Sequence, residues 1–148
     1  MISDGLILAF LGSATAIGLA CSGSGIGVGI AGAAGIGLMT EDPGKFGQAL
    51  LLQALPGTQG TYGLLVGFWV LMKIGIFSGS LVDVSIEQGW KIFFACIPVG
   101  IVGFWSGWYQ GKAAAAAIGL VARKAGEIGK AIVMVTMVET YAVFSLLA

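Results

Sequence analysis

Four long apolar runs, separated by short polar segments, make up most of the chain. They extend over residues 6–38, 46–72, 90–122 and 128–148. About 20 apolar residues are needed for a helix to cross the roughly 30 Å hydrocarbon core of a bilayer, and each run reaches that length. The runs are continuous rather than alternating, which argues against a transmembrane β-barrel. The pattern therefore predicts an all-α membrane protein with four transmembrane helices in a single membrane domain, 1–148.

Short segments with breaker residues connect the four predicted helices in pairs, which gives two hairpins. Pro43 and Gly44 lie between the first two runs, and residues 123–127 connect the last two. We therefore expect a first helical hairpin over 5–72 and a second over 88–148. Positive charges near the two hairpin loops outnumber those at the opposite side: Lys45, Arg123, Lys124 and Lys130 against Lys73 and Lys91. The positive-inside tendency then places both hairpin loops in the cytoplasm and both termini outside.

Composition supports this class and excludes others. The chain is 57% hydrophobic and 9% charged, which is outside the range of ordinary soluble domains. Its formal net charge is zero, so no basic surface indicates binding to nucleic acid. Cys21 and Cys96 both fall inside apolar runs, where we expect them to act as small buried hydrophobic residues.

The two predicted hairpins repeat one another without a gap, at a shift of 82 positions. Ser24-Gly25 corresponds to Ser106-Gly107, and the segment 36–38 has the same residues as 118–120. Because each half contains an even number of spans, both halves cross the membrane in the same sense. This is a parallel repeat, unlike the inverted repeats of many secondary transporters. The chain is therefore a tandem fusion of two helical hairpins.

Small residues are concentrated in the first apolar run. Residues 27–32 match the spelling of a dinucleotide-binding glycine turn, but that motif needs a preceding strand and a soluble strand–helix unit. Gly23 and Gly27 are four residues apart, as are Gly25 and Gly29, and this spacing lets helix backbones approach closely in lipid. We interpret the glycines, and the alanine run 113–117, as surfaces for close helix packing.

Glu139 is the candidate functional residue. It is the only acidic residue in the last apolar run and lies near its middle. A charged carboxylate at the centre of a membrane costs about 2.5–3.5 kcal/mol on insertion scales. Such residues usually bind or move ions, because a proton or a cation neutralises them. In the repeat register Glu139 falls opposite Gly57, so the fused pair has one ionisable site.

Oxygen donors for a cation near Glu139 are few at this membrane depth. Pro56 lacks an amide hydrogen and crowds the preceding turn, so carbonyls near Leu52 to Leu55 are left without normal helical partners. The side chains of Thr58, Gln59 and Gln110 supply further oxygens, and hard cations prefer oxygen ligands.

Tyr62, Thr140 and Tyr141 are candidate supporting residues, while Gln53 and Thr136 are further polar residues of the spans. This chemistry suits Na⁺, although a proton can occupy the same carboxyl group. Separate roles, with a kink proline, a pairing glutamine and a neutral glutamic acid, remain an alternative.

These residues resemble a known family. The segment Leu55-Pro56-Gly57-Thr58-Gln59-Gly60 with Tyr62, the segment Gln110-Gly111-Lys112 and the segment Met137-Val138-Glu139-Thr140-Tyr141 are similar to the duplicated-hairpin proteolipid that forms the rotor ring of V-type ATPases, and in particular to its sodium-pumping bacterial branch. The resemblance covers essentially the whole chain. It implies Na⁺ ligands at the Leu55 carbonyl and at Thr58, Gln59, Gln110 and Glu139, with Tyr62 holding the glutamate closed.

The resemblance also implies partners and a mechanism. We expect identical copies in a ring within the cell membrane, a stator subunit with an arginine, and central stalk subunits docked on the loops 40–45 and 123–127. The chain itself would be a non-catalytic part of an ATP-driven rotary ion pump. Two other classes fit four helices: a small proton-coupled secondary transporter using one membrane glutamate, and a purely structural tetraspan protein.

Overall fold

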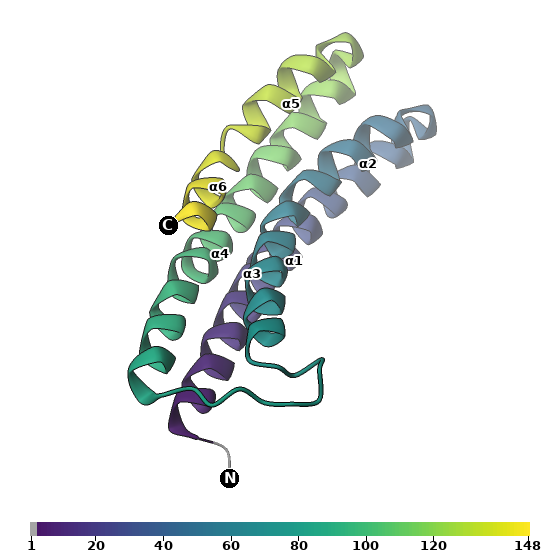
Figure 1. Ribbon diagram of the computed structural model, residues 1–148. Helices are drawn as coiled ribbons and strands as arrows, with labels where there is room; N and C mark the ends of the chain where they lie inside the picture. The colour runs from purple at the N-terminus through teal and green to yellow at the C-terminus, as the bar shows by residue number, and fades with distance from the viewer. Residues whose placement is uncertain (1–2) are drawn as a thin grey trace.

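The computed structural model describes residues 3–148, and within that range the regular secondary structure is entirely helical (Figure 1). The elements in chain order are α1 (Asp4–Glu41), η1 (Pro43–Lys45), α2 (Phe46–Ala54), η2 (Leu55–Gly57), α3 (Thr58–Lys73), α4 (Ile86–Arg123), η3 (Ala125–Glu127), α5 (Ile128–Thr136) and α6 (Thr140–Leu147). The helical expectation is confirmed. The four predicted apolar runs correspond to α1, to α2 through α3, to α4, and to α5 through α6.

The two longest helices, α1 and α4, begin in the same way. Ser3 caps α1 by accepting a hydrogen bond from the amide of Leu6, and Ser85 caps α4 in a capping box with Gln88. Each helix has 38 residues, which corresponds to about 57 Å at 1.5 Å per residue. Both are longer than the hydrocarbon core of a bilayer, so their ends extend beyond it.

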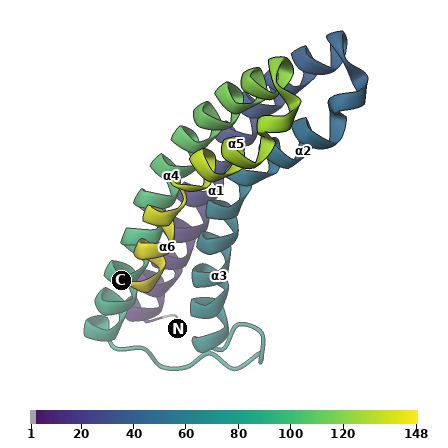
Figure 2. The same ribbon diagram turned by 90° about the horizontal axis from the view of Figure 1, so that it is seen from above.

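Glycine residues bring α1 and α4 into backbone contact along their length (Figures 1 and 2). A Cβ atom added to Gly107 would lie 2.8 Å from the carbonyl carbon of Gly23, and one added to Gly111 would overlap the backbone of Gly27. Part of the packing interpretation is therefore confirmed. It does not hold for Gly25 and Gly29 within one chain, because no atom lies within 4 Å of a Cβ at either position.

The second helix of each hairpin returns along the first. The segment from α2 to α3 follows α1, and the segment from η3 to α6 follows α4 (Figure 2). Among the described residues, three helical segments are long and apolar enough to cross a membrane: Asp4–Glu41, Ile86–Arg123 and Ala125–Leu147. The remaining apolar run is divided by η2 into α2 and α3, so neither piece alone has that length.

The outer surface of the bundle is apolar. Phe94, Phe144 and Leu147 are at least 60% exposed, and Trp69 is 58% exposed. The charged side chains that form ion pairs lie at the ends of the helices, in Asp42–Lys45, Glu87–Lys91 and Glu127–Lys130. A wide apolar band between charged ends is typical of a protein surrounded by lipid. Cys96 is buried as expected, whereas Cys21 is exposed on α1, so the expectation of a buried cysteine is wrong there within a single chain.

Candidate ion-binding site

Both hairpins have an interrupted helix at the same position of the repeat. In the first, η2 (Leu55–Gly57) separates α2 from α3; in the second, residues 137–139 form a turn between α5 and α6. Adding 82 to the bounds of η2 gives this turn. Pro56 has no amide hydrogen to donate and so contributes to the first break. In the second break, the amide of Glu139 donates to the carbonyl of Thr136 at 3.0 Å, a tightened turn that replaces regular α-helical bonding.

Glu139 lies in this second break and faces the first hairpin. Its side chain is half-buried, and its Oε1 accepts a hydrogen bond from the hydroxyl of Tyr62 on α3. The two residues are 77 positions apart, so this bond connects the two hairpins. A hydroxyl that donates to a carboxylate makes one of the stronger hydrogen bonds in proteins.

A network of buried amides lies beside this pair. Gln59 and Gln110 are both fully buried, and the Nε2 of Gln59 donates to the Oε1 of Gln110 at 2.5 Å and to the Oγ of Ser106 at 3.1 Å. Gln110 donates in turn to the carbonyl of Val135 at 3.2 Å, and Ser106 donates to the carbonyl of Val138 at 3.0 Å. Carbonyls at the interrupted helix therefore receive side-chain partners, which a lipid environment requires.

The first break contributes further oxygen atoms. The hydroxyl of Thr58 donates to the carbonyl of Leu55 at 3.0 Å and also reaches the Oε1 of Gln59 at 3.4 Å. Pro56 is buried and packs close to Gly27 of α1, where an added Cβ would lie 2.8 Å from the proline Cβ. The proline thus fixes the break against α1 and leaves Leu55, Thr58 and Gln59 on the side of α4.

Other predicted residues lie differently. The hydroxyl of Thr140 donates to the carbonyl of Met137 within its own helix at 2.8 Å, and Thr136 bonds to the carbonyls of Ile132 and Val133 in the same manner. Tyr141 is 65% exposed. The amide of Gln53 lies against Gly32, where an added Cβ would be 2.5 Å from its Nε2. None of these four side chains has a hydrogen bond to Glu139, Gln59 or Gln110.

No positively charged side chain neutralises Glu139 in the part of the chain that the structure describes, where it forms no ion pair. Lys112 is near the site in sequence, but its Nζ lies 5.2 Å from the ring centre of Trp108 and 5.0 Å from that of Tyr109. Its charge is therefore placed over aromatic faces. Among the described residues, the carboxylate has the neutral hydroxyl of Tyr62 as its hydrogen-bond partner.

Ser106 is the site residue that the sequence analysis missed. Its position in the repeat gave a signal, because it corresponds to Ser24 of the first hairpin. Ser24 is bound to the helix at the first break, where its Oγ accepts from the amide of Gly60 at 2.8 Å. A serine at equal register in both hairpins, each next to an interrupted helix, indicates a role in joining the breaks.

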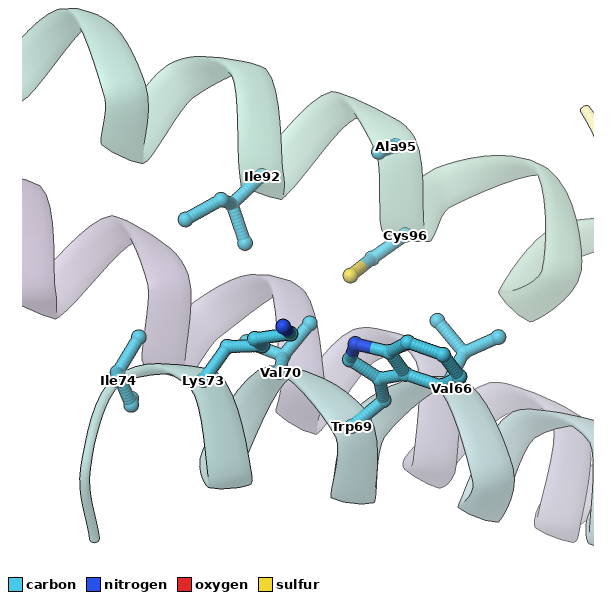
Figure 3. A pocket seen from close by; sticks show the side chains of 8 residues that line it. All are labelled: Val66, Trp69, Val70, Lys73, Ile74, Ile92, Ala95 and Cys96. Atoms are coloured by element: carbon cyan, nitrogen blue, oxygen red, sulfur yellow. The ribbon is translucent and has the colours of Figure 1, made fainter.

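A separate apolar cavity of about 240 Å³ lies between α3 and α4, toward the long connection (Figure 3). Trp69, Val70 and Cys96 are among its lining residues, and Lys73 is the only charged one among the described residues around it. Neither Glu139 and Tyr62 nor the group of Gln59, Gln110 and Ser106 lines this cavity. With no oxygen-rich side chain, this cavity has no ligands for a cation.

A membrane bundle with one half-buried carboxylate among neutral oxygens at paired helix breaks defines a class of ion-translocating membrane protein. Comparison with known proteins gives the particular family. The family model for the C subunit of ATP synthase matches twice, over residues 11–70 and 93–148, so the chain belongs to that family in its duplicated form, the subunit K proteolipid of V-type and A-type ATPases.

Two relatives have similar sequences. The V-type sodium ATPase subunit K of Enterococcus hirae is 42% identical over 141 residues, which are 95% of this chain and 86% of the relative. The A-type ATP synthase subunit K of Methanocaldococcus jannaschii is 43% identical over 144 residues, which are 97% of this chain and 60% of that relative. The duplication inferred from the repeat agrees with the two matches to the family model.

The chain is therefore a non-catalytic, multi-pass membrane rotor subunit that translocates ions within a V/A-type ATPase. The family implies a ring of identical subunits. This assignment decides against the secondary transporter and the purely structural tetraspan protein.

Proposed function

We propose that the coupling ion is Na⁺, bound between the two hairpins by the carboxylate of Glu139, the carbonyl of Leu55 and the side chains of Thr58, Gln59 and Gln110. Tyr62 would hold the carboxylate toward the ion. This donor set has one negative charge and several neutral oxygens, so a monovalent cation leaves the site neutral. A neutral site avoids the cost of about 2.5–3.5 kcal/mol for a bare carboxylate in lipid.

Two neighbouring groups of hydrogen bonds support this proposal, one between Tyr62 and Glu139 and the other among Gln59, Gln110 and Ser106. A carboxyl group that carries only protons needs few partners, whereas a desolvated cation needs several oxygens to replace its water. Here the buried amide of Gln59 and the hydroxyl of Thr58 are already held beside the carbonyl of Leu55. Rotation of the two glutamine amides would direct their oxygens to an ion without moving the backbone.

The competing ion is a proton. Protonation of Glu139 would also neutralise the site, and the Tyr62 hydroxyl would then meet an uncharged acid. The name of the Enterococcus hirae relative specifies sodium, whereas the name of the archaeal relative specifies no ion. The buried glutamine pair favours sodium, because amide oxygens can serve as ligands of a cation but are not needed to bind a proton.

The proposed cycle moves the neutral site through lipid by rotation of the ring. At the stator, a fixed arginine would compete with Na⁺ for Glu139 and release the ion. Moving one charge against 100 mV costs about 2.3 kcal/mol, which ATP hydrolysis in the soluble head would supply. The loops 40–45 and 123–127 would dock the central stalk on the cytoplasmic side. At this end, Lys45 donates a hydrogen bond to the carbonyl of Ala122 and Gln48 donates one to the carbonyl of Ala125, so the two hairpins are connected there.

Carbodiimide labelling of the purified ring tests the proposal. A carbodiimide reacts with a protonated carboxyl group, so we expect Glu139 to be modified and Na⁺ at about 10 mM to protect it by displacing the proton. The label would be located by mass spectrometry of peptides from the last helix. Equal K⁺ should give no protection.

Two controls sharpen this test. Glu139→Gln should abolish labelling of the membrane peptides, while Glu127→Gln, at the helix end in an ion pair with Lys130, should leave labelling and protection unchanged. Labelling at Glu139 that Na⁺ does not reduce at any pH would contradict the sodium proposal and leave the proton as coupling ion.

A further inference from the structure

Helix α1 has two opposite faces that are rich in glycine, and only one of them is packed within the chain. Gly23 and Gly27 lie on the face that contacts α4. Gly18, Gly25, Gly29 and Ile36 are separated by seven, four and seven residues, a spacing that places them on one face of a helix. All four are exposed, and no atom lies within 4 Å of a Cβ at the three glycines. We refer to these four residues as the open stripe of α1.

The repeat contains a second stripe of the same pattern, and that stripe is packed against another helix. The counterparts of the open stripe in α4 are Gly100, Gly107, Gly111 and Ile118, at a shift of 82. All four are buried against α1: a Cβ on Gly100 would lie 2.9 Å from the carbonyl oxygen of Thr15. Ile118 is 2% exposed, whereas the identical Ile36 is 63% exposed. The same sequence pattern is thus buried in one hairpin and bare in the other.

The contact between α1 and α4 therefore provides a template for a contact between copies of the chain. Inside one copy, Gly23 meets Gly107 and Gly27 meets Gly111. Adding 82 to the α1 residues and subtracting 82 from the α4 residues transfers these pairs to the next copy. The transferred pairs are Trp105 with Gly25 of the next copy, and Tyr109 with Gly29 of the next copy. A head-to-tail contact of this type closes into a ring when the rotation permits.

We propose that the open stripe of α1 is the docking surface for α4 of a neighbouring identical subunit, with Trp105 and Tyr109 seated on Gly25 and Gly29. Trp105 is 50% exposed and Tyr109 is 55% exposed in one chain. Both line the same apolar groove, of about 380 Å³, together with Val138 and Tyr141. A large aromatic side chain on a flat glycine surface is a complementary pair, as is Ile36 on the neighbour's alanine run 113–117. The proposal rests on the ring assembly of the rotor.

This pairing makes the two helix contacts of the ring unequal. Within a subunit, glycine meets glycine and the backbones touch. Between subunits, an aromatic side chain occupies the place of Gly23 or Gly27, so the axes of α4 and the next α1 must be farther apart. The circle formed by α1 and α4 of successive subunits would then alternate between close and wide spacing, and the aromatic side chains would fill the wide gaps.

Disulfide crosslinking in the assembled complex tests the pairing. In a background with Cys21→Ser and Cys96→Ala, the double variant Trp105→Cys with Gly25→Cys should form a ladder of dimers and higher multimers upon oxidation. Tyr109→Cys with Gly29→Cys should give the same ladder. Each single variant should stay monomeric on a denaturing gel.

A matched pair off the stripe serves as the control. Gly37 is also exposed with no atom within 4 Å of its Cβ position, but it lies one residue past Ile36 and so points about 100° away. Trp105→Cys with Gly37→Cys should give no ladder. A ladder from this pair, or none from the two stripe pairs in a complex that hydrolyses ATP normally, would overturn the proposal.

Bulk added to the stripe gives a second test. Gly25→Leu and Gly29→Leu have room in the single chain, so helicity by circular dichroism should be unchanged, while rings seen by electron microscopy should fall at least tenfold in number. Gly37→Leu should leave ring formation intact. Normal ring yield for both stripe variants would contradict the docking surface. These readouts need no ion, so a failure of Na⁺ protection at Glu139 leaves them untouched, and the reverse also holds.

Discussion

The two hairpins share a fold and a helix break but differ in what occupies the break. The first is interrupted at Pro56 and has Gly57 where the second has Glu139. The second has Val138 in place of the proline and is interrupted nevertheless. In the first hairpin, Ser24 accepts from an amide beyond the break, whereas in the second, Ser106 and Gln110 donate to carbonyls at the break. The covalent restriction of a proline contributes to one break, and polar side chains of α4 stabilise the other.

This difference explains why one chain has one carboxylate site. The polar groups come from α3 of the first hairpin and from α4 and the second break of the second hairpin. At a shift of 82, Leu55, Thr58, Gln59 and Tyr62 correspond to Met137, Thr140, Tyr141 and Phe144. The equivalent position between two copies therefore has aromatic side chains in place of Gln59 and Tyr62. The repeat therefore has one carboxylate at this position for every two hairpins.

The largest expected effect comes from making the second hairpin as uncharged as the first. Glu139→Gln keeps the shape and a hydrogen-bond acceptor for Tyr62 but removes the charge that we propose binds the ion. We expect ATP-driven ion transport into vesicles to fall to background, a loss of at least about 100-fold, or 2.7 kcal/mol. The ring itself should still assemble. Residual transport above a tenth of the unaltered rate would contradict the role of Glu139.

A smaller effect is expected when the second hairpin receives the residue of the first at Gln110. Gln110→Val copies Val28, and it removes one of the two acceptors of the Gln59 amide and the side-chain donor to the carbonyl of Val135. Two buried hydrogen bonds at about 0.5–1.5 kcal/mol each are lost, so Na⁺ affinity measured by ²²Na⁺ binding should fall by about 10- to 100-fold. Gln48→Val, at the loop end of α2, is the matched control and should leave affinity unchanged.

Loss of the tyrosine hydroxyl should have an intermediate to small effect. Tyr62→Phe, which copies Phe144 of the second hairpin, removes the hydrogen bond to Glu139. A bond to a charged group contributes about 1.5–3 kcal/mol, so Na⁺ should dissociate about 10-fold faster or more in a stopped-flow or isotope-chase measurement. Tyr141→Phe, on an exposed ring, should leave the rate as it is. Equal rates for both variants would exclude Tyr62 as the residue that holds the site closed.

The smallest effect is expected at the proline. Pro56→Val copies Val138 and restores an amide hydrogen to the first break. Because Thr58 still donates to the carbonyl of Leu55 and Ser24 still accepts from the amide of Gly60, we expect the first break to persist and Na⁺ affinity to change by less than about threefold, or 0.7 kcal/mol. Amide hydrogen exchange at residues 55–59 measures the break directly. Strong protection throughout, as in an uninterrupted helix, would show that the proline alone creates it.

Much of the fold was predictable because lipid imposes simple rules. Length and continuity of the apolar runs predict helices, since every backbone group must be satisfied internally, and Pro43 with Gly44 marks the first hairpin loop. Glu139, Tyr62, Gln59 and Gln110 stand out because polar residues are rare at membrane depth. Ser106 did not stand out, since serine is also a common small packing residue in membrane helices. Its role depends on where its hydroxyl points.

The class, the duplication and the single carboxylate follow from the amino-acid order, because hydrophobicity, spacing and charge act locally along the chain. The interruption of the helix at residues 137–139 without a proline depends on tertiary packing, because Gln110 and Ser106 reach carbonyls there from another helix. Tertiary packing also separates Gly23 and Gly27 from Gly25 and Gly29. The two pairs have the same spacing, and burial depends on which neighbour lies against each face.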